Sequence, residues 1–214
     1  SSDSTSASSV AESSGTSTQT SADASSEDES KDESSQEESK DLEANYTKYT
    51  LDGDLTQHMI DMSRLNEGNK VRLANVIKKL KNGEEVTVGF IGGSITQGTS
   101  AGNDLCYAKL TADWLQKTYS NAKINYVNAG IGATGSYIGV HRVANDLLSK
   151  NPDLVFVEFS VNDTTENTER NKKSYDGLLR TIWKSSTNPA IITIATTQED
   201  GTSFQDQHAE IVKH

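Results

Sequence analysis

Val86-Thr-Val-Gly-Phe-Ile91, followed at once by Gly92-Gly93-Ser94, decides the fold of this chain. The run is short, apolar and rich in β-branched residues. The paired glycines end it, which is typical of a buried strand that leads into a tight turn. Similar runs follow at Ile124–Val127, Leu154–Phe159 and Ala190–Ala195. The chain is therefore expected to contribute at least four buried strands to one sheet.

Amphipathic stretches separate these runs. Apolar residues recur at helical spacing before the first run, at Val71, Ala74, Ile77 and Leu80. Comparable stripes lie at 105–119, 140–148 and 175–183, and a helix-like stretch at 206–214 follows the fourth run. Strands that alternate with helices of this length predict βαβ units. We expect an α/β fold, a three-layer α/β/α sandwich around a parallel sheet.

Charge divides the chain into a tail and a body. The 214 residues carry a net charge of −11, but residues 1–44 alone hold 12 acidic and 2 basic residues, 16 serines and no aromatic residue. Such a segment cannot bury enough apolar surface to offset its ordering entropy, so we expect a disordered linker. Residues 45–65 are interpreted as a pre-domain segment and 66–214 as the globular domain.

Several functional classes are excluded by composition. The 170 residues after the tail carry a net charge of −1, which argues against a nucleic-acid partner, because such partners usually require a basic face. No apolar run approaches the roughly 20 residues of a membrane span. Cys106 is the only cysteine, so one chain can form neither a disulfide framework nor a cysteine-based zinc site.

Glycine-rich and polar loops follow the first three predicted strands. Ser94 lies between a glycine pair and a helix-bound segment, where its hydroxyl can project over the carboxyl edge of the sheet. Asn128–Gly135 follows the second strand, and Asn162 with Asp163 follows the third. Backbone N–H groups beside glycines and an asparagine amide are suitable donors to a developing oxyanion.

The second loop also permits another interpretation. Gly130, Gly132 and Gly135 form G-x-G-x-x-G between a strand and a helix, and Glu158 lies 23 residues beyond Gly135. This pattern is typical of a dinucleotide-binding oxidoreductase. The motif does not open the domain, however, and it gives no function to the Ser94 and Asn162 loops.

Taken in order, three motifs resemble those of the SGNH (GDSL-type) hydrolase family. They are Gly92-Gly-Ser-Ile95, Asn128-Ala-Gly-Ile-Gly132 and Val161-Asn-Asp163, and the resemblance covers about residues 65–214. It implies that Ser94 is a nucleophile and that no metal or organic cofactor is required. It also implies an oxyanion hole formed by the Ser94 N–H, by Asn162 and by the N–H of either Gly132 or Ala133.

Two family positions differ in this chain. Gly93 replaces the aspartate of Gly-Asp-Ser-Leu, and Ser160 replaces the glycine of Gly-x-Asn-Asp. The family's last block, Asp-x-x-His, which supplies the base, does not occur after Asn162. We expect the chain to be a piece of a longer hydrolase, with the catalytic His and Asp beyond residue 214.

Four histidines remain for the base, since a serine needs an adjacent base to become a good nucleophile. His58 and His141 are interpreted as surface or packing residues, and His214 ends the chain. The rival hypothesis makes His208, oriented by Asp206, the base. Helix geometry offers this pair no obvious route back to Ser94.

The resemblance implies a serine esterase, secreted or at a cell surface, that deacetylates plant or microbial polysaccharide. The alternatives are the dinucleotide-binding oxidoreductase and a non-catalytic carbohydrate-binding relative. The tail resembles the tethers that follow the lipidated cysteine of Gram-positive surface lipoproteins. A lipid anchor upstream of residue 1 is therefore expected.

Overall fold

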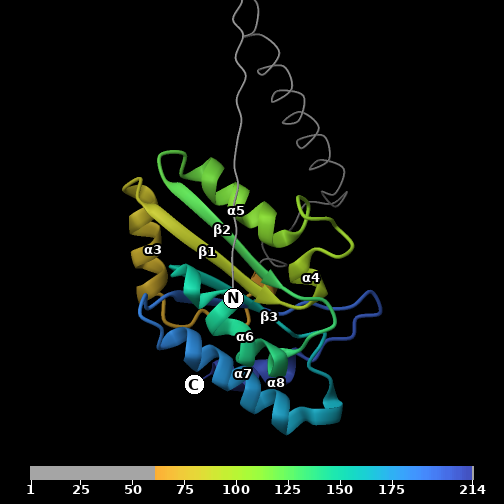
Figure 1. Ribbon diagram of the computed structural model, residues 1–214. Coiled ribbons are helices and arrows are strands. Elements are labelled where there is room, and N and C mark those ends of the chain that lie inside the picture. The colour runs from red at the N-terminus through yellow and green to blue at the C-terminus, as the bar shows by residue number, and fades with distance from the viewer. Residues whose placement is uncertain (1–60, 214) are drawn as a thin grey trace, which may run out of the picture. The chain divides into compact units, whose positions relative to one another are not determined.

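A computed structural model of the chain describes residues 61–213, which all belong to one compact unit, Gln57–His214 (Figure 1). The linker expected at residues 1–44 lies outside the described residues. Of the pre-domain segment 45–65, only residues 61–65 lie inside them.

The four predicted strands are confirmed and form one sheet. They are β1 (Glu85–Gly92), β2 (Lys123–Gly130), β3 (Leu154–Glu158) and β4 (Ala190–Ile194). All neighbouring pairs are parallel, in the order β2-β1-β3-β4. The first strand along the chain is therefore central, and β2 and β4 are the two edges within the described residues.

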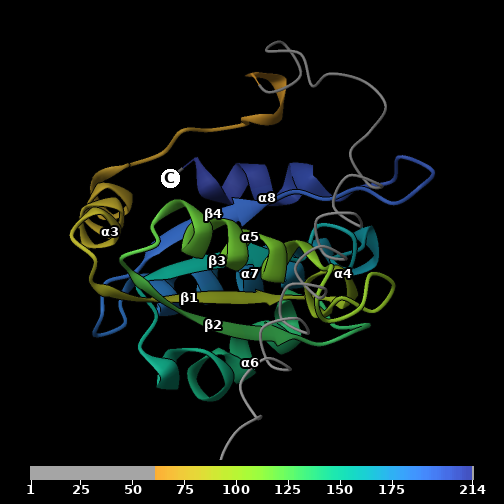
Figure 2. The same cartoon turned by 90° about the horizontal axis from the view of Figure 1, so that it is seen from above.

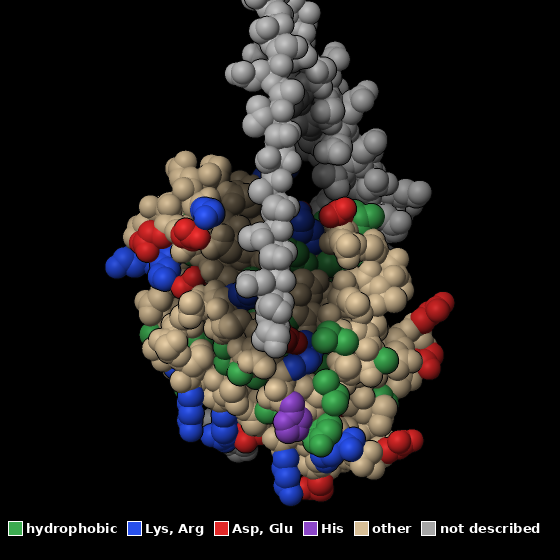
Figure 3. All heavy atoms as spheres, in the orientation of Figure 1, with side chains coloured by type: hydrophobic (Ala, Val, Ile, Leu, Met, Phe, Trp, Pro, Cys, Tyr) green, Lys and Arg blue, Asp and Glu red, His purple; other side chains and the backbone are tan. Residues whose placement is uncertain are grey.

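Helices connect the strands. They are α3 (Val71–Lys81), α4 (Ser94–Gln97), α5 (Tyr107–Thr118), α6 (Ser136–Asp146), α7 (Thr168–Trp183) and α8 (Gln205–Val212), with 3-10 turns η1 (Leu148–Lys150) and η2 (Thr165–Asn167). None of the helices within residues 61–213 is long and apolar enough to cross a membrane. Figure 3 shows cationic and anionic side chains scattered over the face in view, without a large basic area.

Two cores, one on each face of the sheet, confirm the three-layer α/β/α sandwich. Successive side chains of a strand point to opposite faces. Val86, Val88 and Phe90 accordingly pack in the core under α3 and α5, whereas Ile91 packs in the core under α6 and α7. Figures 1 and 2 show this arrangement, in which α8 lies beside α7.

Two helices begin earlier than their apolar stripes predict. Helix α6 begins at Ser136 rather than Val140, because the Asp163 carboxylate accepts a hydrogen bond from the Ser136 N–H across the fold, at 2.8 Å. Helix α7 begins at Thr168 rather than Tyr175. Its first turns are mainly polar and carry no apolar stripe for sequence analysis to detect.

The register of the sheet brings the predicted loops to one edge. Gly92 at the end of β1 pairs with Gly130 of β2 and with Glu158 of β3. Since parallel strands end at the same edge, the segments after these three residues leave the sheet side by side. The Ser94, Gly132 and Asn162 loops therefore start as neighbours.

We predict that Gly89→Ala destabilises the fold. A Cβ at Gly89 would collide with Leu147 Cδ1, which packs against the bare backbone of β1. Overpacking of this kind should lower the free energy of unfolding by about 1–3 kcal/mol in denaturant titration. The matched control is Gly177→Ala, in α7, where a Cβ would lie 3.6 Å from Val140. That change should raise stability by about 0.5–1 kcal/mol, and equal effects of the two substitutions would contradict this picture of the core.

Candidate active site

Ser94 lies in a sharp turn at the carboxyl end of β1. It is the first residue of the single-turn helix α4, which ends at Gly98 in the left-handed conformation (φ 89°). Ser94 is half-buried, and its hydroxyl makes no hydrogen bond within the described residues. The turn thus places at the sheet edge a serine hydroxyl that takes no part in holding the described fold together.

Asn162 packs directly against this turn. A Cβ added at Gly93 would collide with the Asn162 side-chain oxygen and lie 3.4 Å from the Thr134 carbonyl. The Asn162 Oδ1 atom is buried and has no hydrogen-bond partner among the described residues. The absence of a side chain at Gly93 is therefore what allows the asparagine to lie beside the serine turn.

The glycine loop after β2 also lies next to the serine turn. A Cβ added at Gly132 would lie 3.7 Å from the Cβ of Ser94. The Gly132 N–H donates a hydrogen bond to Gln97 Oε1 at 2.6 Å. Ala133 has the left-handed conformation (φ 58°), and its N–H makes no hydrogen bond within the described residues. The structure thus brings Gly132 and Asn162 to the serine turn, with Ala133 next in the loop.

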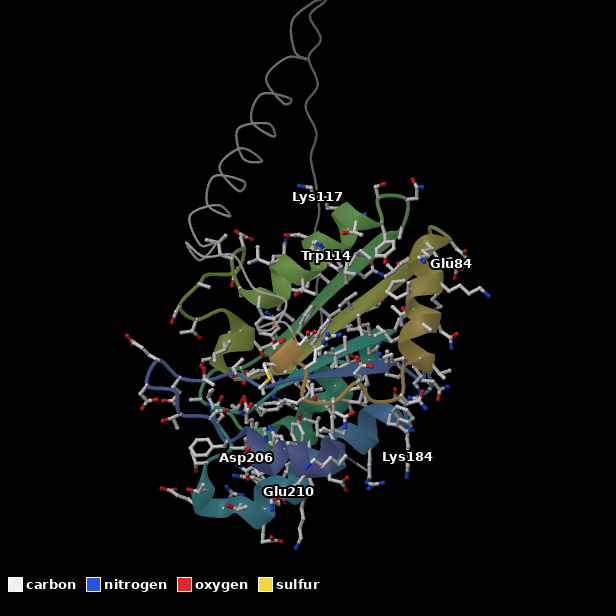
Figure 4. The ribbon with its side chains drawn as sticks, turned by 180° about the vertical axis from the view of Figure 1, so that it is seen from behind. Glu84, Trp114, Lys117, Lys184, Asp206 and Glu210 are labelled. Carbon is white, nitrogen blue, oxygen red and sulfur yellow. The ribbon has the colours of Figure 1, made fainter. Side chains whose placement is uncertain are left out.

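His208 is held elsewhere, by Asp163. Its Nε2 lies 2.8 Å from Asp163 Oδ2, and its ring stacks on Tyr175 with centroids 3.8 Å apart. His208 is buried, whereas Asp206 is exposed on α8 (Figure 4). The hypothesis that Asp206 orients His208 is therefore wrong. Among the described residues, His208 makes no hydrogen bond with Ser94.

A buried polar network supports the serine turn from below. Thr96 Oγ1 lies 2.9 Å from the Tyr107 hydroxyl and 3.4 Å from the fully buried Glu158 carboxylate. The other Glu158 oxygen accepts a hydrogen bond from Thr196 Oγ1 at 2.8 Å. Burial raises the pKa of Tyr107 above its usual value, so its hydroxyl stays protonated even in alkaline solution. The network joins α4 to the ends of β3 and β4.

The same contacts oppose the dinucleotide interpretation. Glu158, the acidic residue that would bind a ribose hydroxyl, is fully buried and bonded to threonines. The Asp163 carboxylate already occupies the N-terminus of α6, where a pyrophosphate would bind. Neither half of a dinucleotide site is open.

Two residues that stabilise the carboxyl edge of the sheet were not predicted from the sequence. Arg142 of α6 donates hydrogen bonds to the carbonyls of Ala129 (2.5 Å) and Gly92 (3.2 Å), and so ties the ends of β2 and β1. A basic residue within an apolar helix stripe was the available signal. The role of Gln97 could not be predicted from the sequence, because its position within the serine motif does not indicate a contact with the glycine loop.

Fold and site together define a class: a parallel α/β/α sandwich with a serine at the carboxyl end of β1, beside an asparagine and a glycine loop. Residues 90–213 match the GDSL-like lipase/acylhydrolase family. The chain belongs to this family. No curated protein matches the chain.

Several similar solved structures are described as esterases. A two-domain esterase (CEX) active on acetylated mannans, co-crystallised with mannopentaose, is 40% identical over 72% of this chain and 42% of its own, with a TM-score of 0.69. A second structure of a two-domain CEX esterase active on acetylated mannans is 42% identical over 70% and 40%, with a TM-score of 0.66. A mutant of the esterase AlinE4, 18% identical over 60% and 71% with a TM-score of 0.50, shares the fold. The chain thus spans less than half the length of the CEX esterases.

We predict that Asp163→Asn destabilises the fold. Asp163 accepts from the Ser136 N–H with one oxygen and lies 2.8 Å from His208 Nε2 with the other, so an asparagine would replace the carboxylate by a weaker, neutral acceptor and force His208 to accept at Nε2. Loss of the carboxylate hydrogen bonds should lower the free energy of unfolding by about 1–2 kcal/mol, measured in denaturant at neutral pH.

The matched control is Asp206→Asn, on the exposed side of α8. A surface change of this kind should alter stability by no more than about 0.5 kcal/mol. A larger loss at Asp206 than at Asp163 would contradict the observed partner of His208.

Proposed function

We propose that this protein is a serine esterase that hydrolyses carboxylic esters through an acyl-enzyme on Ser94. One observation carries the proposal. Ser94 has a free hydroxyl and lies next to the glycine loop, because a Cβ placed on Gly132 would be 3.7 Å from the Ser94 Cβ. The adjacent Gly93 has no side chain, which leaves room for Asn162. A nucleophile and donors from three separate loops therefore meet at one sheet edge.

The chemistry follows from this arrangement. Ser94 Oγ attacks the ester carbonyl carbon while a base takes its proton, and the carbonyl oxygen becomes an oxyanion. The Ser94 N–H, an N–H of Gly132 or Ala133 and the Asn162 side-chain amide donate to that oxygen. Collapse expels the alcohol with the returned proton. Water then attacks the acyl-enzyme by the same route and releases the acid.

Acetylated polysaccharide is the proposed substrate. The support comes from the two CEX esterases, 40% and 42% identical to this chain, which are described as active on acetylated mannans. Two points support a secreted or surface-tethered enzyme. Residues 1–44 are acidic and rich in serine, like the tethers of surface lipoproteins. An acetylated polysaccharide also lies outside the cell.

The identity of the base stays a prediction. His208 is buried, with Nε2 bonded to Asp163 and Nδ1 without a partner among the described residues. These contacts support a structural role for His208 and the expectation of a base beyond residue 214.

We predict that Ser94→Ala, made in the longest natural form of the protein, abolishes turnover of p-nitrophenyl acetate and leaves the fold intact. Ser94 contributes no hydroxyl hydrogen bond to the fold, so the unfolding midpoint should change little. The assay compares kcat/KM with circular dichroism and thermal unfolding of the same samples. Retained esterase activity in a folded variant would exclude Ser94 as the nucleophile.

Labelling with a serine-directed phosphonate, followed by mass spectrometry, locates the nucleophile independently. The 214-residue chain is compared with the longest natural form of the protein and with His208→Gln. An adduct on Ser94 that needs the longer form supports a base beyond residue 214. An adduct in the short form that His208→Gln eliminates assigns the base to His208. Polysaccharide binding without an adduct in any form favours the non-catalytic relative.

We predict that Asn162→Ala lowers kcat by about 10²–10³, as loss of an oxyanion donor does in other hydrolases. KM should change much less, because the donor acts mainly in the transition state. Steady-state kinetics on p-nitrophenyl acetate separates the two parameters. An unchanged kcat would remove Asn162 from the site.

A further inference from the structure

Gln97 makes a contact that catalysis as proposed above would have to break. Its side-chain oxygen accepts the hydrogen bond of the Gly132 N–H at 2.6 Å. That N–H is one of the two loop donors considered for the oxyanion. An N–H group that already donates to a neutral carbonyl oxygen is unavailable to the substrate until that oxygen moves away.

The Gln97 oxygen lies on the glycine loop, close to the serine turn. It lies 2.9 Å from a Cβ placed on Gly132, and the same Cβ lies 3.7 Å from the Ser94 Cβ. Gln97 belongs to α4, one turn after Ser94. The amide oxygen of Gln97 is a neutral carbonyl acceptor, the same chemical type as an ester carbonyl, and it binds a loop N–H near Ser94.

Displacement of this side chain is easy. Gln97 is exposed, and the only other hydrogen bond of its side chain within the described residues is a long one from Thr99 Oγ1, at 3.4 Å. Its backbone, in contrast, is held by the α4 hydrogen bond from the Gln97 N–H to the Gly93 carbonyl, at 3.0 Å. The side chain can thus rotate away while the turn that carries Ser94 stays in place.

We propose that Gln97 is a gate of the oxyanion hole: its carboxamide oxygen occupies the Gly132 N–H in the free enzyme, and the acyl carbonyl of the substrate displaces it. This proposal rests on the proposed esterase function. It assigns to Gln97 a competitive effect on substrate binding, with no part in the chemical step. It also makes Gly132, rather than Ala133, the loop donor that substrate binding frees.

Three substitutions at Gln97, made in the longest natural form of the protein, test the gate in kinetics on p-nitrophenyl acetate. Gln97→Met and Gln97→Ala remove the competing acceptor, so KM should fall by about three- to tenfold with kcat nearly unchanged. Gln97→Glu places a charged, stronger acceptor on the Gly132 N–H, so kcat/KM should fall by more than about tenfold. The matched control is Gln198→Glu, at an exposed glutamine whose side chain makes no hydrogen bond within the described residues.

The opposite pattern overturns the proposal. If Gln97→Met and Gln97→Ala lower kcat and the unfolding temperature while KM stays constant, Gln97 only supports the loop. If Gln97→Glu behaves like Gln198→Glu, the contact does not compete with substrate. Loss of Ser94-dependent activity is scored separately, so failure of the gate and failure of the esterase assignment give different results.

A readout without turnover uses the amide proton of Gly132 in NMR spectra. In the free protein its chemical shift should move on Gln97→Met, because the hydrogen bond is lost. After a phosphonate has reacted with Ser94, the phosphoryl oxygen should take over this N–H, and the same substitution should no longer change its shift. A Gly132 shift that still depends on Gln97 in the adduct would contradict displacement.

Discussion

The parallel pairing of β1 with β2 on one side and β3 on the other is the constraint on which the rest of the structure depends. It places Gly92 opposite both Gly130 and Glu158. A strand shifted by one residue would reverse which of its side chains face each core. The two apolar cores therefore fix the register of the sheet. The register in turn places the three loops side by side at one edge. The site is a consequence of how the sheet packs.

That edge is reinforced by polar contacts that a purely apolar core does not need. Arg142 binds the carbonyls of Gly92 and Ala129, which lie at strand ends where the ladder runs out. On the other face, Thr96 connects the serine turn to Glu158. Buried polar groups destabilise a fold unless they are paired, so these hydrogen bonds stabilise the edge only when they form together. Helix α6 thus ties the strand ends next to the serine turn, and Glu158 of β3 holds the turn itself.

The sequence predicts the sheet and the three loops well, and predicts least where a contact joins distant segments. Apolar runs locate the strands because both faces of a parallel sheet are buried. The start of α6 could not be found in this way, since the acceptor for the Ser136 N–H is Asp163, which lies 27 residues further along the chain. The Gln97–Gly132 hydrogen bond is invisible for the same reason. Motifs predicted which loops come together at this edge, and only packing decides which of their atoms meet.

The two departures from the family motifs follow from their neighbours. Gly93 replaces an aspartate where any Cβ would collide with the Asn162 side chain. Ser160 replaces a glycine where its hydroxyl accepts the Thr196 N–H at 2.6 Å and donates to the Thr196 carbonyl at 3.0 Å. One change removes atoms beside the proposed oxyanion donor, and the other adds a tie between the loops after β3 and β4. Both changes lie beside the serine turn and leave Ser94 itself unaltered, which is why weak motifs still predict the loops that come together at this edge of the sheet.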